Sequence, residues 1–440
     1  MKFDISDYIE NYGPIYYIGE SELEDPIVTY LFRDDFATNH PNIDFDLFTI
    51  VSPKIIPGCY LKRPSRAYVL WDMYFWLLFY RRLKLISRVK ALPSCHVKNK
   101  YFCCSYVFEY ISLSLSSRQS ESNFPYLLHT YSEICKKKSS LSAKEHTLLR
   151  AFIKNNKSFH SELTRIAKLF IFFHERMHLN YSLKIRTKEV DAKVLLTLIK
   201  ELKTTSHPHL KRVYPDDSVW KSFFRKNTTV SEYAGEMEEM RSFVLQEMED
   251  ILMKKPFSNK AEEYFSDFFS LVDIMHLINT NSFGNYSDSQ KEMEAALVAE
   301  AVSLCYGLLF EIKTLLDIWD TYDVMINNAV NPTQITKSII SLVSKNDSNH
   351  RFVNARRMIV LELFWIYNLK TYGLSELGSF GTEDVNTRMA IASYLEETHP
   401  LSDTCKSEIV KIIKEQKNTR GRYLNPKEVF KEIFDRTILI

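Results

Sequence analysis

Glycine is scarce in this chain of 440 residues: only 10 are present, whereas average usage of about 7% would give roughly 30. Few glycines leave little room for glycine-rich phosphate-binding loops or for a sheet with many tight turns, so a helix-rich fold is favoured. An excess of charge of one sign is also missing, because 57 basic and 55 acidic residues give a net charge of +2. The chain therefore lacks the overall positive charge that would indicate a nucleic-acid partner.

A long uninterrupted apolar run is missing as well. Residues 68–80 are apolar but form a short run that contains Asp72, and residues 295–319 are interrupted by Glu300, Glu311 and Lys313. Because a bilayer span needs about 20 mostly apolar residues, both segments are expected to be buried or amphipathic helices. No membrane association is predicted.

Cysteine usage is sparse and shows no disulfide framework. The seven cysteines are scattered, and the N-terminus carries no apolar leader, which together predict a cytoplasmic protein with mostly free thiols. The segment with Cys95, His96, Cys103 and Cys104 matches no zinc-knuckle spacing, so these cysteines are interpreted as small buried hydrophobic residues.

Composition divides the chain into three predicted regions. Residues 1–140 hold much of the proline and glycine together with short β-branched or aromatic pieces, and are expected to form loops and short strands plus a helix over 66–90. Periodicity does not decide between a strand and a buried helix for residues 101–115. The serine-rich stretch 112–122 is expected to be a loop. The other two regions are 141–415 and a tail helix within 416–440.

Apolar residues recur at three- and four-residue spacing throughout the region 141–415. This pattern predicts helices over 143–155, 158–181, 187–204, 231–254, 259–280, 288–327, 334–344, 352–370, 384–397 and 403–415. The predicted fold is therefore mainly α (α+β), with a helical core and an N-terminal region that contains short strands.

The sequence HERMH at residues 174–178 is the informative motif, because it matches the pattern HExxH. His174 and His178 are four residues apart, so on a helix they share one face with their Cβ atoms about 5–6 Å apart. Two imidazoles placed in this way can hold one Zn²⁺, and Glu175 can take a proton from a water molecule that the metal activates. The ordinary alternative is a pair of satisfied core histidines beside a surface glutamate.

A catalytic zinc needs a third protein ligand and an open fourth position. Glu263 is favoured because Asp267, four residues later on the same helix face, can accept a hydrogen bond from the far nitrogen of a ligand histidine. Without the HExxH motif, the two carboxylates would be interpreted as an exposed acidic helix start. Four other side chains are disfavoured by helix face or by a solvated acidic context: His276, Glu262, Glu238 and Glu239.

HExxH followed by a helix of the form E-x-x-[A/S]-D-x-x-[A/S] resembles the gluzincin metallopeptidases. The similarity is to the branch with the CAAX prenyl-protease-like, heat-shock membrane and phage-exclusion peptidases, and Ser266 and Ser270 take the small-residue positions. It covers the motifs within residues 155–410, whereas residues 1–140 match no known pattern. The resemblance implies a zinc metallopeptidase with its metal on His174, His178 and Glu263.

Thr398-His399-Pro400 stands where this branch often carries a small-His-Pro segment, and Lys406 stands near the place of a common arginine. His399 has two interpretations. It can donate a hydrogen bond to the oxyanion that forms when water attacks a carbonyl, or it can cap the helix that begins near Ser402.

The sequence thus predicts a soluble zinc-dependent metalloendopeptidase with Glu175 as general base, Asp267 orienting a ligand histidine and a protein as substrate. The resemblance to phage-exclusion peptidases adds an expected role in antiviral defence by abortive infection. The alternative is a non-catalytic helical scaffold that binds partners through the 231–254 and 288–327 helices and holds at most a structural zinc. The sequence leaves the oligomeric state open.

Overall fold

A computed structural model of the chain describes residues 17–20, 44–51, 58–63, 66–117, 124–204, 230–280, 286–327 and 359–373. Most of these residues lie in α-helices, so the predicted mainly α class is confirmed. None of the helices in these ranges is both long and apolar enough to cross a lipid bilayer.

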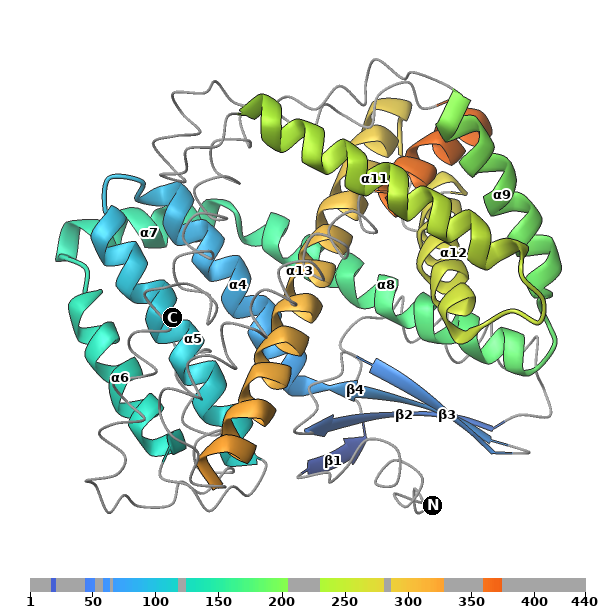
Figure 1. Ribbon diagram of the computed structural model, residues 1–440. Helices are drawn as coiled ribbons and strands as arrows, with labels where there is room; N and C mark the ends of the chain where they lie inside the picture. Colours follow the sequence, from blue (N-terminus) through green and yellow to red (C-terminus); the bar gives the residue numbers. More distant parts are fainter. Residues whose placement is uncertain are drawn as a thin grey trace.

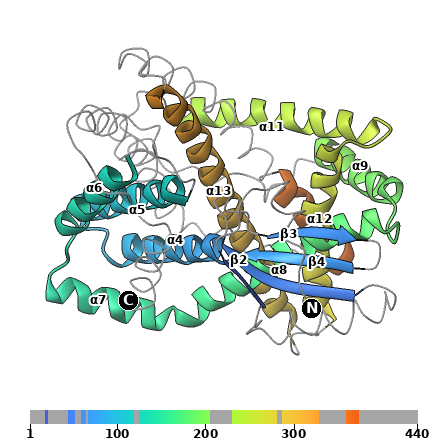
Figure 2. The same cartoon turned by 90° about the horizontal axis from the view of Figure 1, so that it is seen from below.

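The helices form two groups on either side of one long central helix. They are α4 (Met73–Ala91), α5 (His96–Ser117), α6 (Phe124–Lys138), α7 (Ala143–Asn155), α8 (Lys157–Ser182), α9 (Lys188–Thr204), α11 (Val230–Met253), α12 (Asn259–Asn279) and α13 (Asp288–Asn327). In both views α13 runs through the middle, with α4, α5 and α6 on one side and α9, α11 and α12 on the other (Figures 1 and 2). Helix α8 contacts both α12 and α13.

The six helices from α7 to α13 match the segments predicted from periodicity to within one residue at each end. Capping by nearby side chains explains where two of these helices begin. Ser142 and Glu145 form a capping box at the start of α7, and the Ser258 side chain accepts a hydrogen bond from the Ala261 N–H at the start of α12. Residues 359–372 are also helical, in part as predicted for 352–370. Three predicted helices lie outside the described residues: 334–344, 384–397 and 403–415.

Two predictions before residue 140 are corrected. Residues 66–72, expected to begin a helix, form a strand, β4 (Arg66–Asp72), because they pair with neighbouring strands; α4 starts only at Met73, where Asp72 accepts from the Tyr74 N–H at 2.9 Å. The undecided stretch 101–115 is helical within α5, and α5 continues to Ser117 into the expected serine loop. Ser112 is fully buried, so the packed face of α5, which contacts α6, extends into this polar sequence.

A four-stranded sheet lies beside α8 (Figure 1). Its other strands are β1 (Tyr17–Glu20), β2 (Asp44–Val51) and β3 (Gly58–Arg63), and the strand order is β1-β2-β4-β3. β2 and β4 pair in parallel, whereas the two outer pairs are antiparallel. Helix α8 packs against β3. The predicted tail helix within 416–440 lies outside the described residues.

One contiguous apolar core joins the two helix groups. Buried side chains of α4, α5, α6, α8, α9, α11, α12 and α13 belong to this core, whereas α7 contributes none. Its largest members, each almost fully buried, are aromatic: Tyr264, Phe75, Phe79, Phe108, Phe170, Phe172, Phe265, Phe268 and Phe364. Because several of them lie on α8 and α12, close packing fixes the distance between these two helices.

The buried carboxylate of Glu109 provides a test of how the N-terminal helices are held. It lies on α5, only 3% exposed, and pairs with Arg81 of α4 and with Lys136 of α6 at 3.1 Å. We expect Glu109→Gln to lower the free energy of unfolding by about 3 kcal/mol, because it removes a buried negative charge that pairs with two cations only 14% and 26% exposed. Glu133→Gln, on a half-exposed carboxylate that also pairs with Lys136, should change it by less than about 0.5 kcal/mol. Chemical denaturation of both variants measures the difference.

The ion pairs of Glu109 also predict that the free energy of unfolding depends on pH. Burial on its own raises the pKa of Glu109, but Arg81 and Lys136 outweigh burial and hold the pKa below 4.5. A lowered pKa contributes stability that is present above the unfolded value and is lost as the pH falls through the folded value. The difference between wild type and Glu109→Gln should therefore shrink in acid, and a difference that stays constant down to pH 2 would contradict this account.

Candidate metal centre

Helix α8 presents the two histidines of the HExxH motif side by side. The ring centroids of His174 and His178 lie 4.9 Å apart, and their Nε2 atoms are separated by 3.1 Å. The side chains are only 13% and 12% exposed, and the buried side chains of Phe170 and Met177 belong to the same helix. The helical spacing of four residues therefore produces a nearly buried pair of imidazoles.

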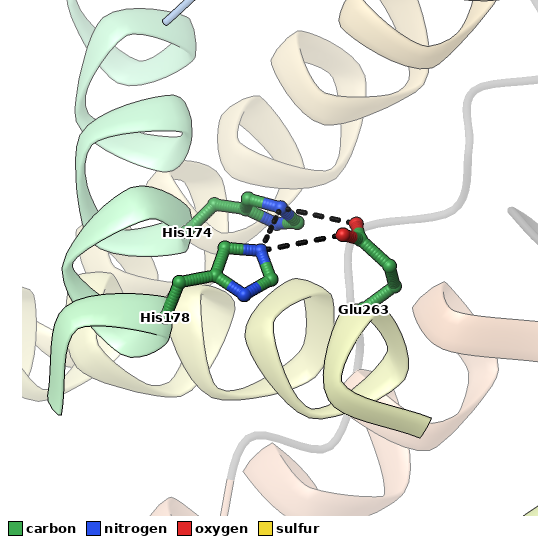
Figure 3. Close-up of side chains that lie close together, drawn as sticks. All are labelled: His174, His178 and Glu263. Carbon is green, nitrogen blue, oxygen red and sulfur yellow. Dashed lines mark hydrogen bonds and ion pairs between the residues drawn. The ribbon is translucent and has the colours of Figure 1, made fainter. Parts of the chain in front are cut away.

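Helix α12, which contacts α8, supplies an acidic side chain that faces the two histidines. One carboxylate oxygen of Glu263 lies 3.3 Å from Nε2 of His174, and the other lies 3.4 Å from Nε2 of His178 (Figure 3). One potential ligand atom from each of the three residues lies within 4.8 Å of the others. Glu263 thus meets two histidines that lie 85 and 89 positions before it in the sequence.

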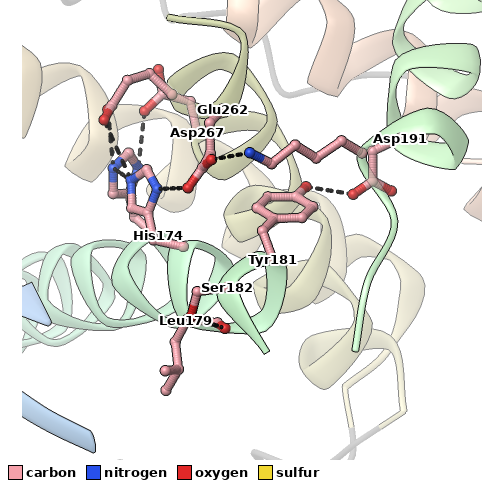
Figure 4. A network of polar contacts seen from close by, with 10 residues as sticks. His174, Leu179, Tyr181, Ser182, Asp191, Glu262 and Asp267 are labelled. Atoms are coloured by element: carbon pink, nitrogen blue, oxygen red, sulfur yellow. Dashed lines mark hydrogen bonds and ion pairs between the residues drawn. The ribbon is translucent and has the colours of Figure 1, made fainter. Parts of the chain in front are cut away.

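The far nitrogen of each imidazole also faces a carboxylate. Nδ1 of His174 lies 3.1 Å from Oδ1 of Asp267, and Nδ1 of His178 lies 2.8 Å from Oε1 of Glu262 (Figure 4). A carboxylate can only accept, so both Nδ1 atoms carry the proton. In the neutral rings both Nε2 lone pairs then point at one another and at Glu263. A cation at the point where they meet would relieve the repulsion between the lone pairs and the carboxylate.

The donor set fits a divalent transition metal. A tetrahedral ion with ligands at about 2.0–2.1 Å has donor atoms about 3.3 Å apart. The two Nε2 atoms lie 3.1 Å apart, and the two oxygens of Glu263 lie 3.3 Å from Nε2 of His174 and 3.4 Å from Nε2 of His178, respectively. Two imidazoles and one carboxylate are ligands that Zn²⁺ accepts. The Glu263 side chain is 45% exposed, so one side of the group is open to solvent, as in catalytic rather than closed structural zinc sites.

The electrostatics of the group favour positive charge at its centre. Burial on its own lowers the pKa of His174, but hydrogen bonds to Asp267 and Glu263 outweigh it and raise the pKa to about 10. Burial alone raises the pKa of Glu263 and of Glu262, yet the facing histidines, with Lys188 beside Glu262, hold both below the usual value. Without a metal, a proton occupies the place of the cation.

The structure brings together four residues that the sequence singled out as ligands or as an orienting partner: His174, His178, Glu263 and Asp267. It also adds Glu262, which the sequence reasoning set aside because it does not share a helix face with Asp267. That reasoning considered only one imidazole. The second ring lies one turn further along α8, where the adjacent position on α12 reaches it with a long glutamate side chain.

The other candidate residues differ in their exposure to solvent. Glu175 follows His174 on α8 and is partly exposed. His276 and Glu239, set aside as ligands, are exposed. His399 lies outside the described residues, so neither of its interpretations is tested.

The cysteine-rich segment does not gather metal ligands among the described residues. Cys103 and Cys104 are buried free thiols within α5, as predicted. The Cys95 thiol donates to Oε1 of Glu145 at 2.9 Å. This segment is therefore part of the helix packing.

No protein-family model matches the chain, and the comparisons with curated proteins and with solved structures found no match either. The donor atoms, their spacing and their partners therefore carry the functional inference. All three features belong to α8 and α12, and the structure describes every residue of both helices.

Loss of one imidazole tests the metal centre directly. We expect the wild-type chain to bind one zinc ion and to gain thermal stability with it, because a ligand that binds only the folded state stabilises that state. His178→Ala should weaken zinc binding by more than about 100-fold, since it removes a ligand and not merely an orienting group. Titration against a zinc-chelating dye measures the affinity.

His276→Ala is the matched control, because His276 is an exposed histidine on α12. It should bind zinc as tightly as the wild-type chain. Equal affinity of His178→Ala and wild type would remove His178 from the site.

Proposed function

We propose that this protein is a zinc-dependent metallopeptidase of the gluzincin type. The observation that supports this most is the convergence of two imidazole Nε2 atoms and a half-exposed carboxylate at 3.1–3.4 Å, with a glutamate directly after the first histidine. A structural zinc site would use four protein ligands and be closed. The open side next to Glu263 leaves room for water and substrate.

Each side chain has a distinct task in this proposal. His174, His178 and Glu263 would hold the zinc ion, which supplies Lewis acidity and lowers the pKa of a water molecule towards about 7. Glu175 would accept a proton from the attacking water and pass it to the leaving amine. Asp267 and Glu262 keep the Nδ1 atoms protonated, so that both Nε2 lone pairs stay directed inward.

The proposed substrate is a protein or peptide in the cytoplasm. The resemblance of the motifs to gluzincins supports peptide hydrolysis, and the free thiols of Cys95, Cys103, Cys104, Cys135 and Cys305 are consistent with a reducing compartment. An amide carbonyl is the group that a zinc ion polarises and that water attacks. A role in abortive infection is supported only by the resemblance to phage-exclusion peptidases.

Replacing the proposed base separates chemistry from metal binding. Glu175→Gln should reduce hydrolysis of an unstructured peptide library by about 10²–10⁴-fold, because general-base catalysis contributes that much. Its zinc affinity should stay near the wild-type value, since Glu175 is not a proposed ligand. Mass spectrometry of the library measures cleavage, and dye competition measures zinc.

Glu189→Gln is the control, because Glu189 is an exposed glutamate in the first turn of α9. It should hydrolyse the library at the wild-type rate. Full activity of Glu175→Gln would show that the base is wrongly assigned. A wild-type chain that binds zinc but cleaves nothing would favour the non-catalytic scaffold.

The defence role predicts toxicity that depends on catalysis. Expression of the wild-type chain in bacteria under phage attack should stop host growth, because an activated peptidase cuts host protein. The Glu175→Gln variant should leave growth unaffected, while Glu189→Gln should behave as the wild type. Growth curves with and without phage measure the effect, and harmless wild-type expression in both conditions would contradict this role.

A further inference from the structure

Glu262 contacts two partners at once. Oε1 lies 2.8 Å from Nδ1 of His178, and Oε2 forms an ion pair with Nζ of Lys188 (Figure 4). The Glu262 side chain is 16% exposed and that of Lys188 is 30% exposed, so the contact is largely shielded from water. A chain of contacts therefore leads from the first residue of α9, through α12, to a candidate metal ligand on α8.

Helix electrostatics do not explain a lysine at this position. Lys188 is the first residue of α9, where the helix dipole disfavours a cation by about 0.3–1 kcal/mol. Glu189 and Asp191, in the same first turn, have the favoured sign. The ion pair with Glu262 offsets the unfavourable position of Lys188.

The turn between α8 and α9 places Lys188 next to the site. Lys184 adopts a left-handed conformation with φ 59°, and the N–H groups of Lys184 and Ile185 donate back to the carbonyls of Tyr181 and Asn180 at 3.1 and 3.0 Å. This is the hydrogen-bond pattern of a Schellman helix end. It reverses the chain within a few residues, so that α9 starts close to the end of α8.

Neighbouring side chains fix the start of α9 further. Nζ of Lys188 lies 5.7 Å from the centre of the Tyr181 ring. The Tyr181 hydroxyl donates to the buried carboxylate of Asp191 (Figure 4). The same carboxylate accepts from Nε of Arg186 at 2.7 Å. Lys188 is therefore held between an aromatic ring and Glu262.

The two candidate ligand histidines differ in how they are held. Asp267, which faces His174, is a short side chain and only 4% exposed, so packing limits its movement. Glu262 is longer and more exposed, and its extra torsion angle allows other orientations. A second contact is needed to keep it on His178.

From this geometry we propose that Lys188 is a positioning residue of the zinc site. Through Glu262 it holds the His178 ring with Nε2 directed towards His174 and Glu263. The inference rests on the proposed zinc site and adds a group that touches neither metal nor substrate. The competing account is an ordinary ion pair between α9 and α12, which contributes about 0–1 kcal/mol to folding and nothing to zinc binding.

A double-mutant cycle tests the positioning role. Zinc affinity is measured by dye competition for wild type, Lys188→Met, Glu262→Gln and the double variant. Orienting groups typically contribute about 10–100-fold to metal affinity. We therefore expect a loss of about 10-fold or more for Glu262→Gln and of about 3–10-fold for Lys188→Met. The double variant should bind no more weakly than Glu262→Gln alone, because Lys188 acts through Glu262.

Two further variants separate positioning from general effects. Lys188→Arg retains the charge and should restore zinc affinity to within about twofold of wild type. Lys193→Met removes an exposed lysine from the same helix and should leave the affinity unchanged. The melting temperature of each variant in excess chelator reports on folding without zinc.

The outcomes distinguish this inference from the proposed function. Wild-type affinity of Lys188→Met, or an equal loss in the wild-type and Glu262→Gln backgrounds, would refute the positioning role while the zinc site stands. Lys188 would be assigned to folding alone if the variant lost zinc affinity and its melting temperature, measured in excess chelator, also fell. A wild-type chain that binds no zinc would overturn the zinc site itself and this inference with it.

Discussion

The site depends on the two carboxylates behind the histidines. Asp267 and Glu262 accept from the Nδ1 atoms of His174 and His178, which leaves two Nε2 lone pairs only 3.1 Å apart. Two lone pairs at this distance repel unless a cation lies between them, and Glu263 adds a negative charge at the same point. The hydrogen bonds to Nδ1 of each ring therefore determine how well the Nε2 side of the group could accommodate a cation.

That constraint is maintained by the packing of α8 against α12. The two Nε2 atoms lie 3.1 Å apart and 3.3 and 3.4 Å from the two different oxygens of Glu263, so a shift of about 1 Å between the helices would break these contacts. Tightly packed aromatic side chains on both helices resist such a shift, among them Phe170 on α8 and Phe265 on α12, each almost fully buried. The apolar core thus determines the geometry of a polar site.

Most of the helical framework and half of the site geometry could be predicted from the sequence, because both follow from the helical period. The spacing of four residues places His174 beside His178, and Glu263 on the face of Asp267. Contacts between helices could not be predicted in this way. Glu262 was set aside because its reach to His178 depends on how α12 crosses α8, and residues 66–72 were misassigned because strand pairing with β2 outweighs local periodicity.

Charge balance gives a further reason to expect a divalent ion rather than a proton. The charged side chains that contact the two imidazoles directly or through Glu262 include the carboxylates of Glu262, Glu263 and Asp267 and the ammonium group of Lys188. With both rings counted as neutral, three negative charges and one positive charge leave two negative charges in a partly buried cluster. A proton on His174 cancels one of them, whereas Zn²⁺ cancels both. Because uncompensated charge is costly where water is excluded, Lys188 and a divalent cation together leave this cluster electrically neutral.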